Sequence, residues 1–395
     1  MVELVERAKP SGGSLIQNPI VRGAVYQIVL VALIVFVVYG AATNAMTAME
    51  RLRMPTDFGF LGQTSGFDIN QTLIPYSHSS TYAEAFWVGL INTLLVGVVG
   101  IVLTTIIGFT VGIARLSSNW IVAKLALVYV ETLRNIPLLL QLLFWYNAVL
   151  KPLPAPRQSI ALPGGIFLNN RGLIFPNPQF GEGAHFVGMA VVIAILAAIL
   201  FTIWASRRQK STGQQSPVGW VWLALLISLP LLTYFALGRP ITFDIPVLKG
   251  FNFAGGRQVF PELVALVLGL SVYTASFIAE IVRAGVQSVA HGQTEAAEAL
   301  GLGAGRIRAL VVVPQAMRVV IPPLTNQYLN LVKNSSLAVF IGYPDLVQVF
   351  AGTVLNQTGA AVQVMAITML VYLVISLFTS AIMNMYNRRI ALVER

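Results

Sequence analysis

Eight apolar runs, each close to the length of a membrane-spanning helix, constrain what this chain can fold into. A helix needs about 20 mostly apolar residues to cross a hydrocarbon core about 30 Å thick. Composition agrees, because 56% of the 395 residues are hydrophobic and only 10% are charged. The sequence therefore predicts an all-α, polytopic membrane protein with about eight transmembrane helices. The runs lie at about 25–43, 86–114, 120–149, 186–205, 218–237, 260–283, 319–343 and 361–386.

Two of the runs contain polar residues and prolines that interrupt a regular helix. Unwound backbone is tolerated at membrane depth only where protein or a water-filled cavity surrounds it. We therefore predict a helix that ends near Asn135 and is followed by a second, broken one, and a further break within 327–337. The interrupting residues are Glu131, Arg134, Asn135 and Pro137 in the first run, and Pro322, Pro323, Asn330, Lys333 and Asn334 in the second.

Lysine and arginine near the ends of the runs predict the orientation, because cytoplasmic loops carry an excess of both. The segments 44–85, 151–185 and 238–259 then lie outside, and both termini are predicted to be cytoplasmic. The net charge of +10 is scattered over the run ends without an aromatic-interleaved basic patch, which excludes nucleic acid as a partner. The inside residues are Arg7, Lys9, Arg22, Arg115, Lys124, 206–210, Arg283, Arg306, Arg308, Arg318, Arg388, Arg389 and Arg395.

A short charged stretch, "GQTEAAEALGLGAG" at 292–305, lies in one of the predicted cytoplasmic loops. Thr294 can cap a helix whose first turn holds Glu295, and the glycines from Gly301 onward end it. So short a helix is marginal in water and needs packing to stabilise it. Its Ala296, Ala297 and Leu300 share a shallow face, which suits either a groove on another protein or an ordinary amphipathic loop.

The string "EAAEALG" at 295–301, followed by "VVVP" at 311–314, resembles the EAA loop of permease subunits in ABC importers. The family's spacing is kept from Glu295 through Gly301 to Pro314, with Val311 and Val313 where Ile and Leu are usual. The resemblance implies that 290–314 is a coupling loop that docks on a cytoplasmic ATPase. Its expected contact residues are Glu295, Ala296, Ala297, Leu300, Gly301 and Pro314.

Two longer stretches, about 84–150 and 260–390, are similar to the polar amino acid permease family, whose typical members have five core spans. Here an N-terminal span and an insertion are added, as in the long subunits of general L-amino acid permeases. The resemblance implies the core of a type I ABC importer permease. The expected parts are a cytoplasmic tail (1–24), an extra span with a periplasmic loop (25–83), the first part of the core (84–150), the insertion with two spans (151–259), and the rest of the core (260–390).

Nucleotide hydrolysis is not expected in this chain, because it lacks the phosphate-binding pattern GxxxxGK[ST]. The resemblance implies that partner ATPase subunits bind ATP and Mg²⁺, that the chain itself holds no cofactor and is no enzyme, and that a second homologous permease subunit completes a heterodimer. It also implies a periplasmic binding protein, an L-amino acid substrate and the bacterial inner membrane. No metal site is expected, since the chain has no cysteine and three separated histidines.

An amino acid needs helix N-termini or hydroxyl donors for its carboxylate, and carboxylates or carbonyls for its ammonium group. The two broken stretches supply such groups, although Ser and Asn in membrane helices more often bond to neighbouring helices. Glu131 with Arg134, and Glu280 with Arg283, are spaced to neutralise one another. The pathway candidates are Glu131, Arg134, Asn135, Asn330, Lys333, Asn334, Ser335 and Ser336.

Gly108 and Gly112, four residues apart, predict close packing of their helix against a neighbour.

Two other functions fit an apolar polytopic chain. An ion-coupled secondary transporter would use Glu131 or Glu280 as its coupling carboxylate, but it leaves the 290–314 loop unexplained. A membrane-embedded enzyme would need clustered metal-binding aspartates, whereas Asp57, Asp68, Asp244 and Asp345 are expected to be isolated in loops.

Overall fold

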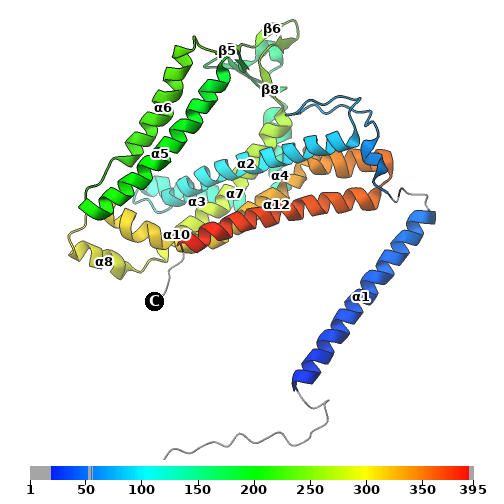
Figure 1. Cartoon of the computed structure of the whole chain (residues 1–395), viewed down its shortest axis with the longest axis horizontal. Helices are drawn as coiled ribbons and strands as arrows, with labels where there is room; N and C mark the ends of the chain where they lie inside the picture. Colours follow the sequence, from blue (N-terminus) through cyan, green and yellow to red (C-terminus); the bar gives the residue numbers. More distant parts are fainter. Residues whose placement is uncertain (1–18, 52–54, 56, 391–395) are drawn as a thin grey trace, which may run out of the picture.

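The computed structural model describes residues 19–51, 55 and 57–390, so most of the expected tail 1–24 and Arg395 lie outside the described residues. Helices dominate the described part of the chain, as predicted (Figure 1). They are α1 (Pro19–Arg51), α2 (Tyr82–Ala114), α3 (Trp120–Asn135), α4 (Leu138–Leu143), α5 (Ala184–Thr212), α6 (Val218–Ala236), α7 (Pro261–Gln287), α8 (His291–Ala299), α9 (Ala304–Ile307), α10 (Val313–Asn334), α11 (Leu355–Thr358) and α12 (Ala361–Ile390).

Seven helices in the described residues are long and apolar enough to cross a membrane, and a bent pair makes an eighth candidate. The pair consists of α3 and the stretch Leu138–Leu150, which meet at 107°. The predicted interruption after Asn135 is therefore confirmed. The prediction for 327–337 is only partly right: α10 runs unbroken to Asn334, past Pro322 and Pro323, and then tightens into the 3₁₀ helix Ser335–Ile341.

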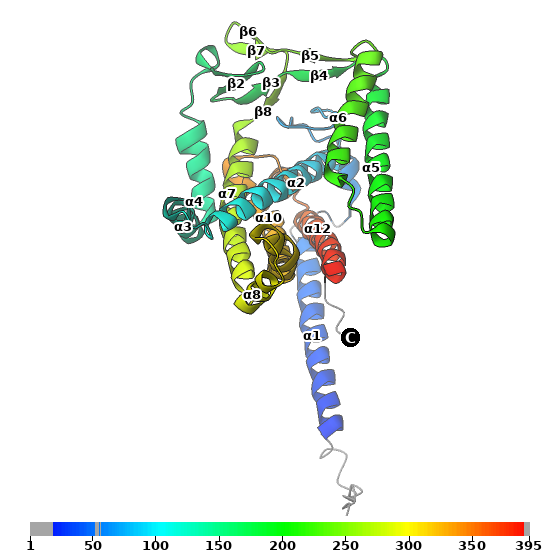
Figure 2. The same cartoon turned by 90° about the vertical axis from the view of Figure 1, so that its left-hand side faces the viewer.

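The long helices separate two kinds of structure at opposite ends of the molecule. The short strands gather at one end, and α8 lies at the other (Figures 1 and 2). Between them α7 is central, because it packs against α2, α3, α4 and α10. Leu266 and Leu270 of α7 are fully buried in one core cluster with Leu142 and Tyr343.

The contact between α2 and α7 depends on the two glycines that the sequence spacing singles out. A Cβ at Gly108 would lie 2.6 Å from Cγ2 of Ile278, and a Cβ at Gly112 would lie 2.8 Å from the carbonyl oxygen of Ala279. No side chain fits at either position without displacing α7. The predicted close packing through these glycines is confirmed.

The insertion forms a helical hairpin with small sheets at its end. In α5 the buried residues Ala190, Ala194 and Ala198 recur every four positions, and α5 packs along α6. Small side chains at this spacing let two helices approach closely in a membrane. Figure 1 shows the hairpin standing beside the other helices, with the strands at its upper end.

Three small antiparallel sheets were not foreseen from the sequence. The first has the order β1-β2-β3-β8, while β4 pairs with β5 and β6 with β7. Strands of three or four residues are too short for an alternating pattern to stand out, and two of the five pairings, β3 with β8 and β4 with β5, join strands from opposite sides of the hairpin. They are β1 (Ile160–Leu162), β2 (Ile166–Asn169), β3 (Gly172–Phe175), β4 (Asn177–Phe180), β5 (Ile241–Asp244), β6 (Val247–Lys249), β7 (Asn252–Ala254) and β8 (Arg257–Val259).

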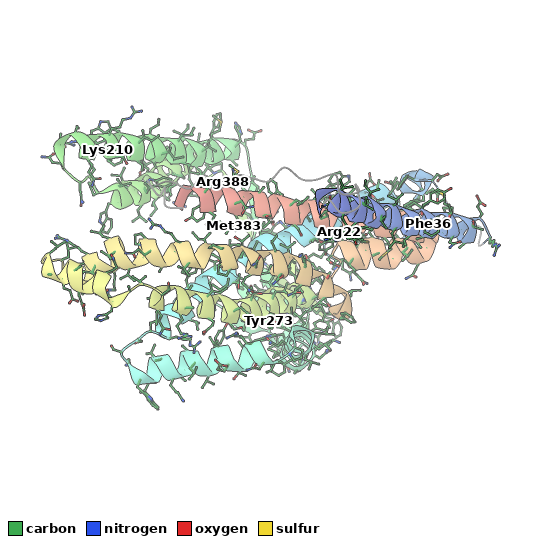
Figure 3. All side chains as sticks on the ribbon, turned by 90° about the horizontal axis from the view of Figure 1, so that it is seen from below. Arg22, Phe36, Lys210, Tyr273, Met383 and Arg388 are labelled. Carbon is green, nitrogen blue, oxygen red and sulfur yellow. The ribbon has the colours of Figure 1, made fainter. Side chains whose placement is uncertain are left out.

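Helix α1 extends away from the remaining helices (Figure 2) and buries none of its most apolar stretch against them. Phe36, near its middle, is 74% exposed. Seen from below, Lys210 lies near the end of α5 and Arg388 near the end of α12 (Figure 3). A helix as apolar and exposed as α1 needs lipid or another protein around it.

Candidate functional site

The short helix α8 starts earlier than predicted. It begins at His291 after Ala290, which makes no side-chain capping bond, and so Thr294 lies inside the helix and does not cap it. Nδ1 of His291 lies 2.9 Å from Oε1 of Glu295, one turn further along. The capping prediction for Thr294 is wrong, because the chain already turns into helix after the extended Ala290.

The end of α8 depends on Gly301, as the sequence suggests. Gly301 has φ +77°, a conformation in which a Cβ is strained. Its N–H donates to the carbonyl oxygen of Glu298 at 2.8 Å, and the N–H of Leu302 donates to that of Ala297 at 3.2 Å. This pair of bonds is the Schellman arrangement that satisfies the last carbonyls of a helix.

The surface of α8 divides differently from the predicted shallow face. Ala297 is 5% exposed, whereas Leu300 is 81% exposed and Ala296 points outward with it. On its inner side α8 contacts the π-helical segment Arg308–Val312, next to Pro314 in the first turn of α10. Glu295, Ala296, Glu298 and Leu300 are therefore free for another protein, and Ala297 is not.

The helix ends above α8 are joined by an ion-pair cluster. Nη2 of Arg283 donates to Oε1 of Glu280 at 2.5 Å, which confirms the predicted pair. Arg115, at the end of α2, donates to the other carboxylate oxygen of Glu280. One carboxylate thus ties the end of α2 to α7, next to the loop that carries α8.

The other predicted pair, Glu131 with Arg134, does not form among the described residues. The guanidinium of Arg134 lies over the ring of Phe277, 5.3 Å from its centre, and Glu131 is exposed. Nδ2 of Asn135 donates to the carbonyl oxygen of Glu131 at 2.7 Å. The pairing prediction is wrong because α7 brings an aromatic face to Arg134, which no local spacing reveals.

Two buried polar residues near the helix breaks were not among the site residues predicted from the sequence. Gln141 spans the bend between α3 and α4 with two hydrogen bonds to backbone carbonyls. Asp345 is fully buried, and its carboxylate accepts the N–H of Gln348 at 2.8 Å and the hydroxyl of Tyr372 at 3.2 Å. Gln141 lies in the broken part of the run 120–149, which was the available signal for it. Asp345 lies beyond the break predicted within 327–337, so no predicted break marked it.

The candidates on α10 separate into two kinds. The hydroxyls of Ser335 and Ser336 donate to carbonyl oxygens of their own helix, those of Val332 and Lys333, at 2.8 and 2.7 Å. Asn330 and Lys333 are exposed, and Asn334 is half-buried. With the exposed Asn326, which the sequence analysis did not single out, Asn330 and Lys333 form a polar stripe along one face of α10 at spacings of four and three.

The structure does not join the two groups of pathway candidates. Helices α3 and α10 pack on α7, and within the described part of the chain no hydrogen bond or ion pair links Glu131, Arg134 or Asn135 to the α10 stripe. In residues 19–51, 55 and 57–390 no three His, Asp or Glu side chains lie together as metal ligands.

The bundle of long apolar helices and its bent pair define a multi-pass membrane protein, with α8 exposed at one end. Residues 100–392 match the family described as "Binding-protein-dependent transport system inner membrane component". The chain belongs to this family and is a permease subunit of the ABC type, not an enzyme. Family membership favours this class over an ion-coupled secondary transporter.

Known proteins resemble the chain over its whole length and over its core. It is 52% identical to the general L-amino acid transport system permease protein AapQ of Rhizobium johnstonii, over 97% of this chain and 95% of that protein. It is 49% identical to the putative amino-acid ABC transporter permease protein YhdX of Escherichia coli, over 98% and 99%. It is 41% identical to the probable glutamine ABC transporter permease protein GlnM of Bacillus subtilis, over 56% of this chain and 98% of that protein.

Proposed function

We propose that this chain forms part of the translocation pathway of an importer that carries L-amino acids across the bacterial inner membrane. The observation that carries the proposal is the 52% identity, over 97% of the chain, to a general L-amino acid permease. Separate ATPase subunits bind ATP and Mg²⁺, and a periplasmic binding protein delivers the substrate. Import proceeds by alternating access, in which substrate and nucleotide bias two packings of the helices.

Helix α8 is the proposed contact with the ATPase. Leu300 is an exposed apolar anchor, and Glu295 and Glu298 add negative charge on the same short helix. Gly301 ends the helix so that Leu300 stands at its tip, while the buried Ala297 faces the rest of the chain. Because Arg115, Glu280 and Arg283 join the adjacent helix ends, a movement of α8 would reach α2 and α7 together.

The polar stripe on α10 is the proposed lining of the pathway. Exposed amide and ammonium groups in a membrane-spanning helix face a bundle interior or a watery cavity, because lipid does not solvate them. Asn326, Asn330 and Lys333 point away from their own chain, so a second permease subunit would complete the cavity opposite them. Glu131, Arg134, Asn135 and Asn334 are proposed to lie along the same route.

The proposed topology places both termini and α8 in the cytoplasm and the strands in the periplasm. The basic residues at the ends of α5 and α12 lie on the side that this topology assigns to the cytoplasm. The proposed parts are the tail 1–24, the added span and loop 25–83, the core segments 84–150 and 260–390, and the insertion 151–259. The insertion then provides a periplasmic platform of strands on a helical hairpin.

The proposed coupling is tested by replacing the exposed residues of α8. We expect Glu298→Lys combined with Leu300→Ser to insert normally but to lose capture of the ATPase and ATP-dependent amino acid uptake. The matched control is Glu182→Lys, a charge reversal in an exposed loop at the strand end. If uptake persists without the ATPase and stops when the proton gradient is removed, the importer proposal is wrong.

The proposed pathway is tested at Lys333. We expect Lys333→Gln to slow uptake while ATPase capture stays unchanged, because the ammonium faces the pathway and does not touch α8. Lys249→Gln, on an exposed strand, is the matched control. Unchanged uptake in both variants would mean that Lys333 does not line the pathway.

A further inference from the structure

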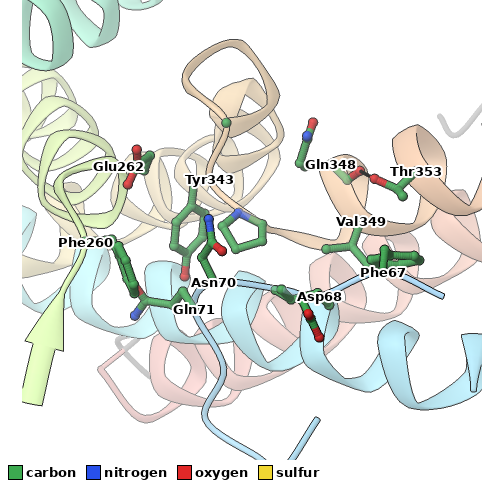
Figure 4. Close-up of a pocket in the computed structure, with 13 residues that line it drawn as sticks. Phe67, Asp68, Asn70, Gln71, Phe260, Glu262, Tyr343, Gln348, Val349 and Thr353 are labelled. Atoms are coloured by element: carbon green, nitrogen blue, oxygen red, sulfur yellow. Dashed lines mark hydrogen bonds between the residues drawn. The ribbon is translucent and has the colours of Figure 1, made fainter. Parts of the chain in front are cut away.

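A polar cavity lies near the strand end of the helices, away from α8 and from the α10 stripe. It holds about 190 Å³ and is shown in Figure 4. Its polar lining comes from the segment before α2, the start of α7 and the segment before α11. These residues are Asp68, Asn70, Gln71, Glu262, Gln348 and Thr353.

The walls of the cavity are held in place by one buried amide. Nδ2 of Asn92, a fully buried residue of α2, donates to the carbonyl oxygens of Gln71 at 2.9 Å and Pro344 at 2.8 Å. The hydroxyl of Tyr343 donates back to the carbonyl oxygen of Asn92 at 3.2 Å. Gln71 and Pro344, on two walls, are therefore positioned by the same side chain, and the cavity is preformed.

The chemistry of this cavity suits a cation with N–H donors. It is lined by two carboxylates, Asp68 and Glu262, and by no lysine or arginine. Glu262 is positioned by the hydroxyl of Tyr146, which donates to its Oε1 at 2.7 Å. Gln71 is only 8% exposed, and its Oε1 has no hydrogen-bond partner among the described residues. That atom has almost no accessible surface, so the two carboxylates are the groups that can hold an ammonium ion in this cavity.

A second cavity shares part of this lining and adds the missing positive charge. It holds about 350 Å³, and Asn70, Phe260 and Glu262 line both cavities. The insertion contributes four further residues of the wall: Asn170, Arg171, Asn252 and Gln258. Nε2 of Gln258 donates to the carbonyl oxygen of Arg171 at 2.6 Å. This bond fixes the turn before β3, from which the exposed side chain of Arg171 extends.

We propose that the two cavities together form an outer binding site for an amino acid zwitterion. Glu262, which lines both cavities, holds the ammonium group. Arg171 holds the carboxylate, since a guanidinium matches a carboxylate with two parallel bonds. The site rests on the proposed function and gives the insertion a role in it: the insertion supplies the group that recognises the carboxylate. Substrate occupies this site before it reaches the α10 stripe.

The test measures equilibrium binding of tritiated L-glutamine to the nucleotide-free complex of permease and ATPase subunits, without binding protein, together with ATP-driven uptake into liposomes. Glu262→Gln keeps an acceptor for Tyr146, and Arg171→Gln removes an exposed guanidinium that no described hydrogen bond uses. We expect each variant to bind L-glutamine about tenfold more weakly, the size of one lost charge-assisted contact. The matched controls are Glu182→Gln and Arg257→Gln, which lie outside both linings and should bind like the wild type.

Failure of this site is distinct from failure of the proposed function. If wild type and both variants bind and import L-glutamine equally well, the outer site is wrong and the importer stands. If the wild-type complex binds L-glutamine through Glu262 and Arg171 but imports no amino acid, the outer site stands and the importer is wrong. Equal weakening in the control variants would show a general effect of surface charge and would overturn the site.

Discussion

Nε2 of Gln141 donates a hydrogen bond of 2.9 Å to the carbonyl oxygen of Leu133, across the bend between α3 and α4. The same nitrogen lies 3.0 Å from the carbonyl oxygen of Ile136. At the 107° bend both carbonyls lose their helical partners, and Pro137 has no N–H to offer. A buried side-chain amide on α4 thus satisfies the backbone that the break exposes.

Replacing Gln141 with leucine is expected to destabilise the bend. Two partly buried carbonyls lose their donor, and a fully buried carbonyl left without one costs about 1–3 kcal/mol, which is the upper limit for each. We expect a lower unfolding temperature for Gln141→Leu in detergent, measured by tryptophan fluorescence. Gln209→Leu, at an exposed position near the end of α5, should unfold at the same temperature as the wild type. Equal unfolding temperatures for the two variants would mean that the bend does not depend on Gln141.

Gly108→Ala is expected to force α2 and α7 apart. The added Cβ would meet Ile278 at 2.6 Å, and overpacking of this kind costs about 1–3 kcal/mol. Gly188→Ala in α5 is the matched control, because nothing lies within 4 Å of its new Cβ. We expect only Gly108→Ala to lower the unfolding temperature. A neutral Gly108→Ala would show that α7 moves away at no cost.

Gly301→Ala is expected to weaken capture of the ATPase. Alanine at φ +77° costs about 1–2 kcal/mol, so the last turn of α8 frays and Leu300 is no longer held at its tip. Gly303→Ala is the control, because Gly303 has φ −71° and an open Cβ position. The measurement is the amount of ATPase that co-purifies with each variant. Equal amounts of co-purified ATPase would mean that docking does not depend on the geometry of the helix end.

Glu280→Gln is expected to leave two arginine side chains facing each other at the ends of α2 and α7. Breaking a buried ion pair costs about 3–5 kcal/mol, and these partly exposed groups should lose less, about 2 kcal/mol. The unfolding temperature should therefore fall, and adding Arg283→Gln should restore part of the loss. The double-mutant cycle measures this coupling. Strict additivity of the two changes would mean that Arg283 and Glu280 do not interact.

Features that depend on nearby residues were predictable from the sequence. The membrane spans, the interruption before Pro137 and the glycine contact of Gly108 all follow from the length and local spacing of apolar or small residues. The same holds for the end of α8 at Gly301, because helix termination is a local backbone property. Local spacing failed at Arg134, where Phe277, far away in the sequence, competes for the guanidinium.

The sequence by itself determined that the chain spans a membrane several times and presents a short polar helix on one side. The reason is that the length of an apolar run and the charges at its ends are properties of each segment alone. Only the tertiary structure decided that Gln71, Arg171 and Glu262 line adjoining cavities, since these residues come from three separate segments. Their proximity depends on how β3 pairs with β8 and how Asn92 ties the loop before α2 to Pro344. Contacts of this kind form only when distant parts of the chain dock, and no local pattern encodes them.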